Sequence, residues 1–298
     1  AAVKKGCQLY KDIKSAAGDV SAVLKDLDDQ FHKKHPPDNP PTPAQVKQFN
    51  EKKAEVKADK KVEVKKEAKA EKKAEKKEAK ADKKAEKTLF EELSRARPGY
   101  GFNMEESGVV EGSDKSHTWH IDPLDGTMNF MHGVPHFAIS VGLERDNQPI
   151  AGVIYDPIKD ELFIAERGKG AFVNNRRLRV SGRIDVVDGV FATGIPTISK
   201  SNHPAYLKKL ANVMARSSGI RRMGAAALDL AYVAAGRFDG YWEEGLQSWD
   251  MAAGIVMIRE AGGFVSDLQG KDLMMESRSV VCGNETMHKI LLGMVKDA

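Results

Sequence analysis

Two aspartates, Asp122 and Asp125, stand at the end of an apolar stretch and offer oxygen ligands to a hard cation. The stretch 117–121 reads HTWHI and leads into DPLDGT, where a proline fixes the backbone between the carboxylates and a glycine permits a sharp turn. Residues 126–128 then begin a predicted helical turn, whose free N–H groups can face a phosphate. The alternative is an acidic surface turn with ordinary Asp-Gly turn chemistry.

Two further acidic sites lie at junctions between predicted elements. Glu105 and its neighbour Glu106 follow the strand-like residues 101–104, although such a pair is also common in surface loops. Asp250 precedes small residues that allow a helix to approach closely, although aspartate at a helix start is also a common N-cap. Three acidic positions of this kind fit one oxygen-rich site for Mg²⁺.

The elements that must position these acids fall into two halves. A helix ends over 88–96, and the strands that follow cover 117–121, 137–144, 150–155, 161–165 and 189–193. Their close succession indicates a largely antiparallel sheet. Later helices cover 204–215, 225–235 and 250–261 and begin again at 285, and they alternate with strands over 220–222, 240–243, 264–267 and 279–282. This α/β pattern places a boundary near residue 195.

The first 81 residues differ from the rest of the 298-residue chain. Residues 51–87 contain 16 Lys against 8 Glu and 2 Asp, which gives this run a net charge of +6. Because the whole chain has a net charge of +4, all other residues together carry −2. This run has few large apolar side chains, and we interpret it as a solvated helix or a disordered spacer. A nucleic-acid-binding arm and an oligomerising helix are the alternatives. The run contains no aromatic residue, which disfavours strong nucleic-acid binding.

Cysteine content and hydropathy indicate the compartment. Cys7 and Cys282 cannot build a disulfide framework, nor can they alone form a structural zinc site. No stretch approaches about 18 apolar residues, and the N-terminus lacks the apolar core of a signal peptide. We therefore expect a cytoplasmic, soluble protein without a membrane partner.

Five segments together resemble the inositol monophosphatase family, and most of all its bacterial branch that includes the extragenic suppressor proteins. They are MEESG (104–108), WHIDPLDGTMNF (119–130), GVPHFAISVGLE (133–144), GVIYDPIKDELFIAERGKGAFVN (152–174) and WDMAAGIVMIREAGG (249–263). The resemblance runs from about Asp82 to the C-terminus. It implies an α/β protein with the layered αβαβα sugar-phosphatase fold, which fructose-1,6-bisphosphatase shares. An atypical segment 1–81 would precede an α+β metal-binding half, 82–194, and an α/β half, 195–298.

The resemblance also implies a set of site residues. The metal ligands would be Glu105, Asp122, Asp125, Asp250, the carbonyl of Leu124 and, at a weaker site, Asp82. The catalytic residues would be Glu105, Asp122 and Thr127, with Thr127 and Glu105 positioning and deprotonating the attacking water. The substrate-binding residues would be Asp125, Gly126, Thr127, Met128, Gly224, Ala225, Ala226, Glu243 and Asp250.

The chain departs from the family pattern at a few of these positions. Met104 stands where the family has glycine, Met128 where it has a second threonine, and Ala225 where serine or threonine is common. Ahead of Asp82, residues 78–81 read EAKA where the family has a hydroxyl-bearing turn. None of these changes removes one of the four main carboxylates.

The function implied is Mg²⁺-dependent, lithium-sensitive hydrolysis of inositol monophosphate or a similar small polyol phosphate, by direct attack of activated water. The alternatives are a related phosphatase for histidinol phosphate, a fructose bisphosphate or a phosphorylated nucleotide, and a regulatory protein that binds the RNA-synthesis machinery. The family is often dimeric, so a homodimer is expected. His132 and His136 lie near the DGTMNF segment, and we interpret them as loop or packing residues.

Overall fold

The computed structural model describes residue 47 and residues 82–195 and 203–296. Most of the Lys-rich run 51–87 and Cys7 lie outside these residues. Contacts group residues 81–130 and 135–298 into one compact unit, and residues 1–80 and 131–134 into another. The fold described below is that of the first unit.

An eight-stranded sheet occupies the first half of this unit. Its strands are β1 (Gly101–Met104), β2 (Gly108–Val110), β3 (His117–Asp125), β4 (Ala138–Arg145), β5 (Gln148–Asp156), β6 (Glu161–Glu166), β7 (Gly170–Val173) and β8 (Arg176–Arg177). Their order across the sheet is β2-β1-β3-β4-β5-β6-β7-β8. Only the β1–β3 pair within this sheet is parallel, so the prediction of a largely antiparallel sheet is confirmed. The assignment of residues 189–193 to this sheet is wrong, because that strand lies in the second sheet and pairs there in parallel.

A five-stranded mixed sheet and most of the helices occupy the second half. The sheet has the order β10-β9-β11-β13-β12 and comprises β9 (Val190–Thr193), β10 (Gly219–Arg221), β11 (Gly240–Glu244), β12 (Phe264–Ser266) and β13 (Ser279–Gly283). The helices are α3 (Thr127–Met131), α4 (His203–Met214), α5 (Ala226–Ala234), α6 (Ser248–Glu260), α7 (Met274–Ser277), α8 (Glu285–Val295) and a 3₁₀ turn, η1 (Val186–Asp188). A further helix covers 82–96.

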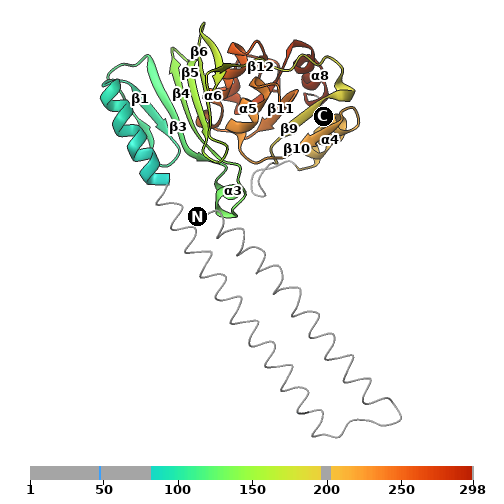
Figure 1. The fold of residues 1–298 in the computed structure, drawn as a ribbon, viewed down its shortest axis with the longest axis horizontal. Coiled ribbons are helices and arrows are strands. Elements are labelled where there is room, and N and C mark those ends of the chain that lie inside the picture. The colour runs from blue at the N-terminus through green and yellow to red at the C-terminus, as the bar shows by residue number, and fades with distance from the viewer. Residues whose placement is uncertain (1–46, 48–81, 196–202, 297–298) are drawn as a thin grey trace. The chain divides into compact units, whose positions relative to one another are not determined.

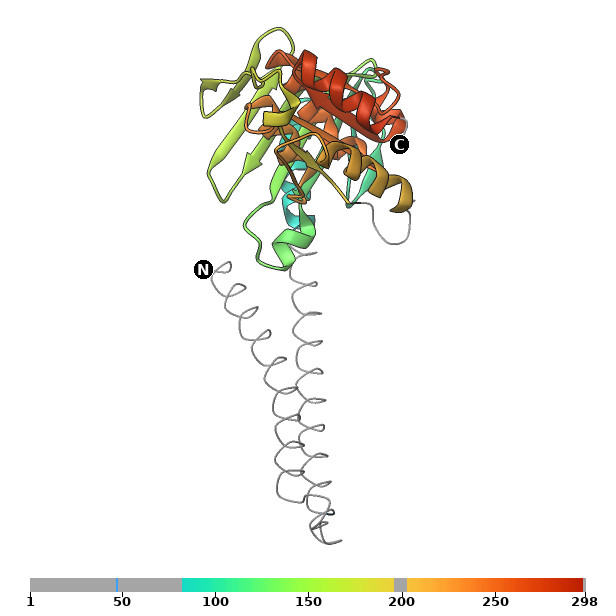
Figure 2. The ribbon, with the colours of Figure 1, turned by 90° about the vertical axis from the view of Figure 1, so that its right-hand side faces the viewer.

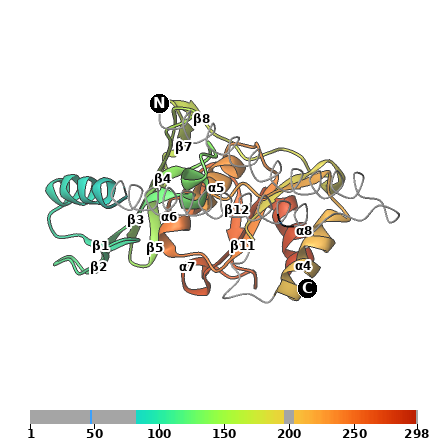
Figure 3. The same ribbon diagram turned by 90° about the horizontal axis from the view of Figure 1, so that it is seen from below.

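These elements form five layers, as the αβαβα expectation requires (Figure 1). The 82–96 helix covers one face of the large sheet, where Leu89, Phe90 and Leu93 pack on β1 and β3. The other face carries α5 and α6, which also contact the small sheet. Figure 3 shows these layers edge on, and Figure 2 shows α4 and α8 side by side on the outer face of the small sheet.

Helix α6 lies unusually close to the large sheet because glycines face it. A Cβ atom on Gly142 of β4 would come within 2.6 Å of Ala252 Cβ, and one on Gly152 of β5 would come within 2.6 Å of Ala253 Cα. Any side chain at either glycine would therefore push the helix away. Small residues on both sides thus set the height at which α6, and Asp250 at its start, stand above the sheet.

The structure corrects several predicted bounds. Strand β3 continues through the DPLD segment to Asp125 rather than ending at residue 121. The strands β2, β7 and β8 and the short helix α7 were not expected. Within the run 51–87, Asp82 and Glu86 are buried, so its last residues belong to a packed helix rather than a solvated one. Among the described residues, the helices are too short or too polar to cross a bilayer.

Candidate active site

The end of β3 holds two predicted metal ligands in a buried turn. Asp122 is 2% exposed and Asp125 is 8% exposed. The pairing with β4 shifts register between them, which is the signature of a β-bulge. The Leu124 N–H donates to Asp122 Oδ1 at 2.8 Å, and the Thr127 hydroxyl donates to the Leu124 carbonyl at 3.0 Å. The local sequence thus folds back on itself and fixes both carboxylates.

Asp125 is also tied to a helix from the other half of the chain. Its two carboxylate oxygens accept the N–H groups of Ala226, at 3.2 Å, and Ala227, at 2.8 Å, in the first turn of α5. A helix N-terminus offers such unpaired donors and a favourable dipole for an anion. The predicted small-residue turn therefore reaches the site through Asp125.

Asp250 joins the site from α6. The N-cap of this helix is Gln247, whose N–H donates to Asp250 Oδ2 at 2.7 Å, so the alternative that Asp250 is itself the N-cap is wrong. The hydroxyl of Ser248, the first residue of α6, forms hydrogen bonds with His120 Nδ1 at 2.9 Å and with the Asn103 amide nitrogen at 3.0 Å. These contacts connect β1 and β3 to the start of α6 and hold Asp250 in place.

Glu105 follows β1 at the solvent-exposed rim of the site. Its loop is held by Glu86 of the 82–96 helix, which accepts the Glu106 N–H at 2.9 Å and the Ser107 hydroxyl. Glu86 is 2% exposed and its charge faces Glu105. The Lys-rich run therefore contributes one acid to the neighbourhood of the site. Asp82, on the same helix, is buried, and its assignment as a ligand stays a prediction.

We call Glu105, Asp122, Asp125 and Asp250 the carboxylate cluster, because they perturb one another electrostatically. Burial, together with the charges of Asp125, Glu105 and Asp250, raises the pKa of Asp122 well above its usual range. Burial and the charge of Asp250 do the same to the pKa of Asp125. Burial also raises the pKa of Asp250 to about 6, and loss of hydration raises that of Glu105. Four acids this close are costly to keep ionised together, and the charge of Arg278 only partly offsets the rise in the pKa of Asp250.

A hard cation fits this donor set. Each of the three aspartates accepts hydrogen bonds from backbone N–H groups, and its carboxylate keeps further lone pairs. Carboxylate and carbonyl oxygens are the ligands that Mg²⁺ prefers. In the described part of the chain, no three His, Cys, Asp or Glu side chains already stand in the arrangement of a metal cage. The cluster supplies the donor types that a metal site needs, but not yet a ligating arrangement, so its ligand assignment stays a prediction.

The segment after Asp125 turns sharply and begins α3. Gly126 has φ +91°, and a Cβ there would lie 3.2 Å from Ala225 Cβ, so glycine is required. The N–H groups of Thr127 and Met128 in the first turn of α3 have no acceptor within the helix, which leaves them available to an anion. The Met128 side chain is 59% exposed and points out of the core.

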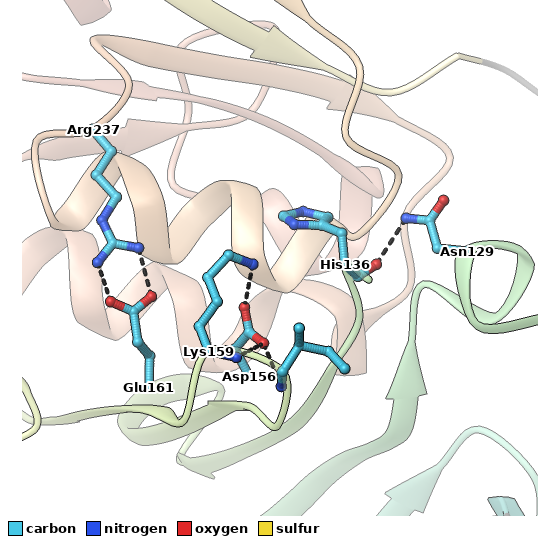
Figure 4. A network of polar contacts seen from close by, with 7 residues as sticks. Asn129, His136, Asp156, Lys159, Glu161 and Arg237 are labelled. Carbon is cyan, nitrogen blue, oxygen red and sulfur yellow. Dashed lines mark hydrogen bonds and ion pairs between the residues drawn. The ribbon is translucent and has the colours of Figure 1, made fainter. Parts of the chain in front are cut away.

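Asn129, to which the sequence assigned no role, connects the two sides of the site. Its amide nitrogen donates to the carbonyl of His136 at 2.8 Å (Figure 4), to that of Met223 at 2.8 Å and to that of Gly224 at 3.3 Å. Gly224 has φ +85° and precedes Ala225, the N-cap of α5. Asn129 thus joins α3 to the turn that was predicted to bind substrate.

Glu243 lies on β11 and is half-buried. It accepts a hydrogen bond from the Tyr241 hydroxyl, and burial raises the pKa of Glu243 to about 7. Asp229 of α5 is 1% exposed, and its Oδ1 has no hydrogen-bond partner among the described residues. Burial and the charges of Glu243 and Asp125 raise the pKa of Asp229 well above its ordinary value, while Arg222 lowers it. Glu243 therefore belongs to a second, linked acidic group.

The two histidines agree with the packing and loop interpretation. His136 is 4% exposed, and its ring meets Tyr232 edge on at 5.8 Å between centroids. Burial, followed by the nearby charge of Lys159, lowers the pKa of His136 to about 4, so the ring is neutral near pH 7. His132 is exposed.

Sequence reasoning missed Glu86, Asn129, Asp229 and Tyr241. Asp229 had a detectable signal, since it is the only charged residue in the apolar helix AALDLAYVA. Glu86 had none, because it stands among many Glu and Lys residues of similar spacing. Tyr241 reads as an ordinary apolar strand residue until its hydroxyl is seen to meet Glu243.

Comparisons with known proteins agree with this geometry. The model of the inositol monophosphatase family matches residues 44–297, so the match begins well before Asp82. An inositol-1-monophosphatase of Mesorhizobium japonicum is 60% identical over 208 residues, which are 70% of this chain and 78% of that protein. The Nus factor SuhB of Escherichia coli is 42% identical over 209 residues, 70% of this chain and 78% of that protein. The crystal structure of the extragenic suppressor protein suhB of Bartonella henselae, 56% identical, superposes with a TM-score of 0.71 over 73% of this chain and 83% of that one.

Proposed function

The chain belongs to the inositol monophosphatase family, a family of phosphoric monoester hydrolases, and we propose that it hydrolyses inositol monophosphate or a similar small polyol phosphate with Mg²⁺ as cofactor. The observation that carries the proposal is the carboxylate cluster, in which two buried acids of β3 and half-buried Asp250 of α6 have raised pKa values. A bound cation would neutralise such a cluster, and it would also stabilise the charge that develops when a phosphate dianion is hydrolysed.

The residues that would hold Mg²⁺ are Glu105, Asp122, Asp125, Asp250 and the carbonyl of Leu124, with Asp82 as a candidate for a weaker ion. When bound, the metal would offset the charge of the phosphate and make water a stronger acid. The positive charge of the metal would also keep a deeply buried aspartate ligand ionised near pH 7.

The remaining groups are proposed to act directly on water and substrate. The Thr127 hydroxyl donates a hydrogen bond to the Leu124 carbonyl, so its oxygen is free to accept a hydrogen bond from the attacking water. Glu105, whose pKa is raised, would take the other proton as general base. The water oxygen then bonds to phosphorus, the ester P–O bond breaks, and the alcohol leaves with a proton from solvent.

Substrate binding is proposed to use both halves of the chain. The N–H groups of Gly126, Thr127 and Met128 would face the phosphate. Glu243, together with Gly224, Ala225 and Ala226, would face the hydroxyl groups of the polyol. Glu243 near its pKa of about 7 accepts hydrogen bonds from such hydroxyls in its ionised form.

The test is phosphate release from inositol 1-phosphate with and without Mg²⁺, with lithium in a third arm. We expect activity that requires Mg²⁺, falls with lithium and is lost in Asp122→Asn. The matched control is Asp188→Asn, an exposed aspartate outside the site, which should retain activity. A folded protein with no phosphate release from inositol phosphates or polyol phosphates would refute the proposal.

The preferred substrate is tested by a side-by-side panel of inositol 1-phosphate, histidinol phosphate, fructose 1,6-bisphosphate and a 3′-phosphorylated nucleotide. We expect the highest kcat/KM for the inositol ester, because Glu243 suits a ring rich in hydroxyl groups. A higher value for one of the others would transfer the assignment to that substrate.

A second candidate is a regulatory role in the RNA-synthesis machinery. The observation that favours it is that relatives such as the E. coli protein, 42% identical, carry the name Nus factor. The test immobilises the full wild-type chain on one resin and the Asp122→Asn variant on another. Equal retention of purified RNA polymerase by both would support the role. Loss of retention with both proteins would exclude it.

A further inference from the structure

A cavity of about 300 Å³ lies at the far end of α5 from the carboxylate cluster, and arginines line it. The amino end of α5 donates to Asp125, whereas Ala235, its C-cap, borders the cavity. A nine-residue helix separates the two ends by about 13 Å. The charged lining residues are Arg176, Arg177, Arg179 and Arg237, and the others are apolar. We call this cavity the arginine pocket.

Three of the four arginines have no acidic partner in the described residues. Arg237 is already paired, since both of its terminal nitrogens donate to Glu161 (Figure 4). By contrast, Arg176, Arg177 and Arg179 form no ion pair with any carboxylate of residues 82–195 and 203–296, and Arg179 donates only to the neighbouring carbonyl of Leu178 at 2.9 Å. Three unneutralised guanidinium groups around one concavity form a focused positive potential.

The backbone beneath these arginines is well fixed. The β7–β8 hairpin turns at Asn174 and Asn175, which have φ of +45° and +65°, and the Leu178 N–H donates to Ala171 at 2.8 Å. The Arg177 guanidinium packs over the Gly170 backbone. A Cβ atom at Gly170 would lie 3.0 Å from Cζ of Arg177. The hairpin backbone and the Arg177 guanidinium are thus held in position before a ligand arrives, which lowers the entropic cost of binding.

We propose that the arginine pocket binds a compact, multiply charged phosphate anion, such as tripolyphosphate or the triphosphate of a nucleotide. Guanidinium groups recognise phosphate oxygens through paired, charge-assisted hydrogen bonds. No aromatic side chain lines the pocket, so it offers no stacking platform for the bases of single-stranded RNA. The ligand is therefore recognised by its phosphates. This binding is separate from hydrolysis and does not depend on the proposed substrate.

The first test is calorimetric titration of the full chain with sodium tripolyphosphate in the presence of EDTA. Without a cation the carboxylate cluster repels anions, so the signal excludes the catalytic site. The triple variant Arg176→Gln, Arg177→Gln, Arg179→Gln is expected to bind about tenfold more weakly or worse. The control triple variant, Arg97→Gln, Arg167→Gln, Arg216→Gln, loses the same charge at exposed positions outside the pocket.

The control is essential because the lysines of residues 51–87 also attract anions. Equal weakening in both triple variants, or no binding by the wild type, would overturn the proposal. A parallel titration with ATP identifies the ligand class. Similar affinities assign the site to the phosphate chain alone, whereas tighter binding of ATP assigns it to a nucleotide.

A second readout locates the ligand. Phenylglyoxal modifies accessible arginines, and mass spectrometry counts the modification at each position. Tripolyphosphate is expected to protect the peptide that contains Arg176, Arg177 and Arg179 and to leave Arg97 and Arg167 reactive. Uniform protection, or protection of the control arginines alone, would contradict the assignment.

Discussion

A Cβ atom on Gly194 would lie 1.8 Å from Oε1 of Glu243, so the Glu243 carboxylate occupies the space that any side chain at Gly194 would need. Gly194 follows β9, and Glu243 lies on β11, which pairs with β9 in parallel. The position of Glu243 therefore depends on the absence of a side chain one strand away.

Replacing Gly194 with alanine should displace the Glu243 carboxylate and weaken substrate binding. We expect KM for inositol 1-phosphate to rise about tenfold, the cost of one charge-assisted hydrogen bond, with kcat changed far less. Steady-state kinetics measure both constants. The control is Gly182→Ala, because a Cβ at Gly182 meets nothing within 4 Å. An unchanged KM in Gly194→Ala would show that Glu243 does not contact the substrate.

The Tyr241→Phe variant should alter the pH dependence of binding. The Tyr241 hydroxyl donates to Glu243 and thereby lowers the pKa of Glu243, which burial otherwise raises, to a balance of about 7. Without this donor the Glu243 pKa rises further, and the acid loses its proton only at higher pH. The pH below which KM increases should therefore move upward in the variant. Identical pH profiles of KM would contradict this role of Tyr241.

Asp229→Asn should stabilise the protein at high pH. Burial raises the pKa of Asp229 well above its ordinary value, so the folded chain keeps a proton that the unfolded chain releases above about pH 4. The stability that protonated Asp229 contributes is therefore fully present below the pKa of this group in the unfolded chain. It is lost as the pH rises through the pKa of Asp229 in the folded chain. Asparagine has no such linkage, so we expect a gain on the order of 1 kcal/mol at pH 8 and little change at pH 4.

Urea unfolding of wild type and Asp229→Asn at both pH values gives these free energies. Asp188→Asn, an exposed change, serves as control and should stay within about 0.5 kcal/mol of wild type at either pH. A gain of equal size at pH 4 and pH 8 would show that the effect comes from packing rather than from the proton.

Magnesium should stabilise the folded chain independently of any turnover. At a free Mg²⁺ concentration one hundred times its Kd, the expected gain is about 2.7 kcal/mol, which raises Tm by about 5 °C or more. Asp122→Asn removes one ligand and one repulsive charge, so its Tm in EDTA should rise and its response to Mg²⁺ should shrink. Differential scanning calorimetry measures both. A full Mg²⁺ response in Asp122→Asn would place the ion elsewhere.

Residues close in sequence made much of the site predictable. The DPLDGT segment contains a proline, a glycine and two acids within six positions, and it forms the predicted turn with both carboxylates buried. Its continuation as strand was not foreseen, because proline and turn residues argue against a strand and the pairing of β3 with β4 overrides that local preference. The β7–β8 hairpin was also missed, although Asn174-Asn175 is a turn signal of the left-handed type.

Contacts between distant segments were beyond what periodicity can reveal. Nothing near Asn129 indicates that its amide meets Met223 and Gly224, which lie 94 and 95 positions later. The tight approach of α6 to Gly142 and Gly152 likewise depends on the pairing of elements that the sequence leaves open. Sequence patterns identify which residues carry chemistry, whereas the partners that orient them emerge only from the three-dimensional packing.

The hydrogen bonds from Ala226 and Ala227 to Asp125 have a consequence for synthesis on the ribosome. They span 101 and 102 positions, so the aspartate turn emerges long before the helix that neutralises it. Until that helix is made, Asp125 of the nascent chain lacks these two donors. The proposed catalytic centre therefore cannot mature in stages, and any product that stops before α5 contains the predicted ligands of the first half but lacks both these donors and Asp250.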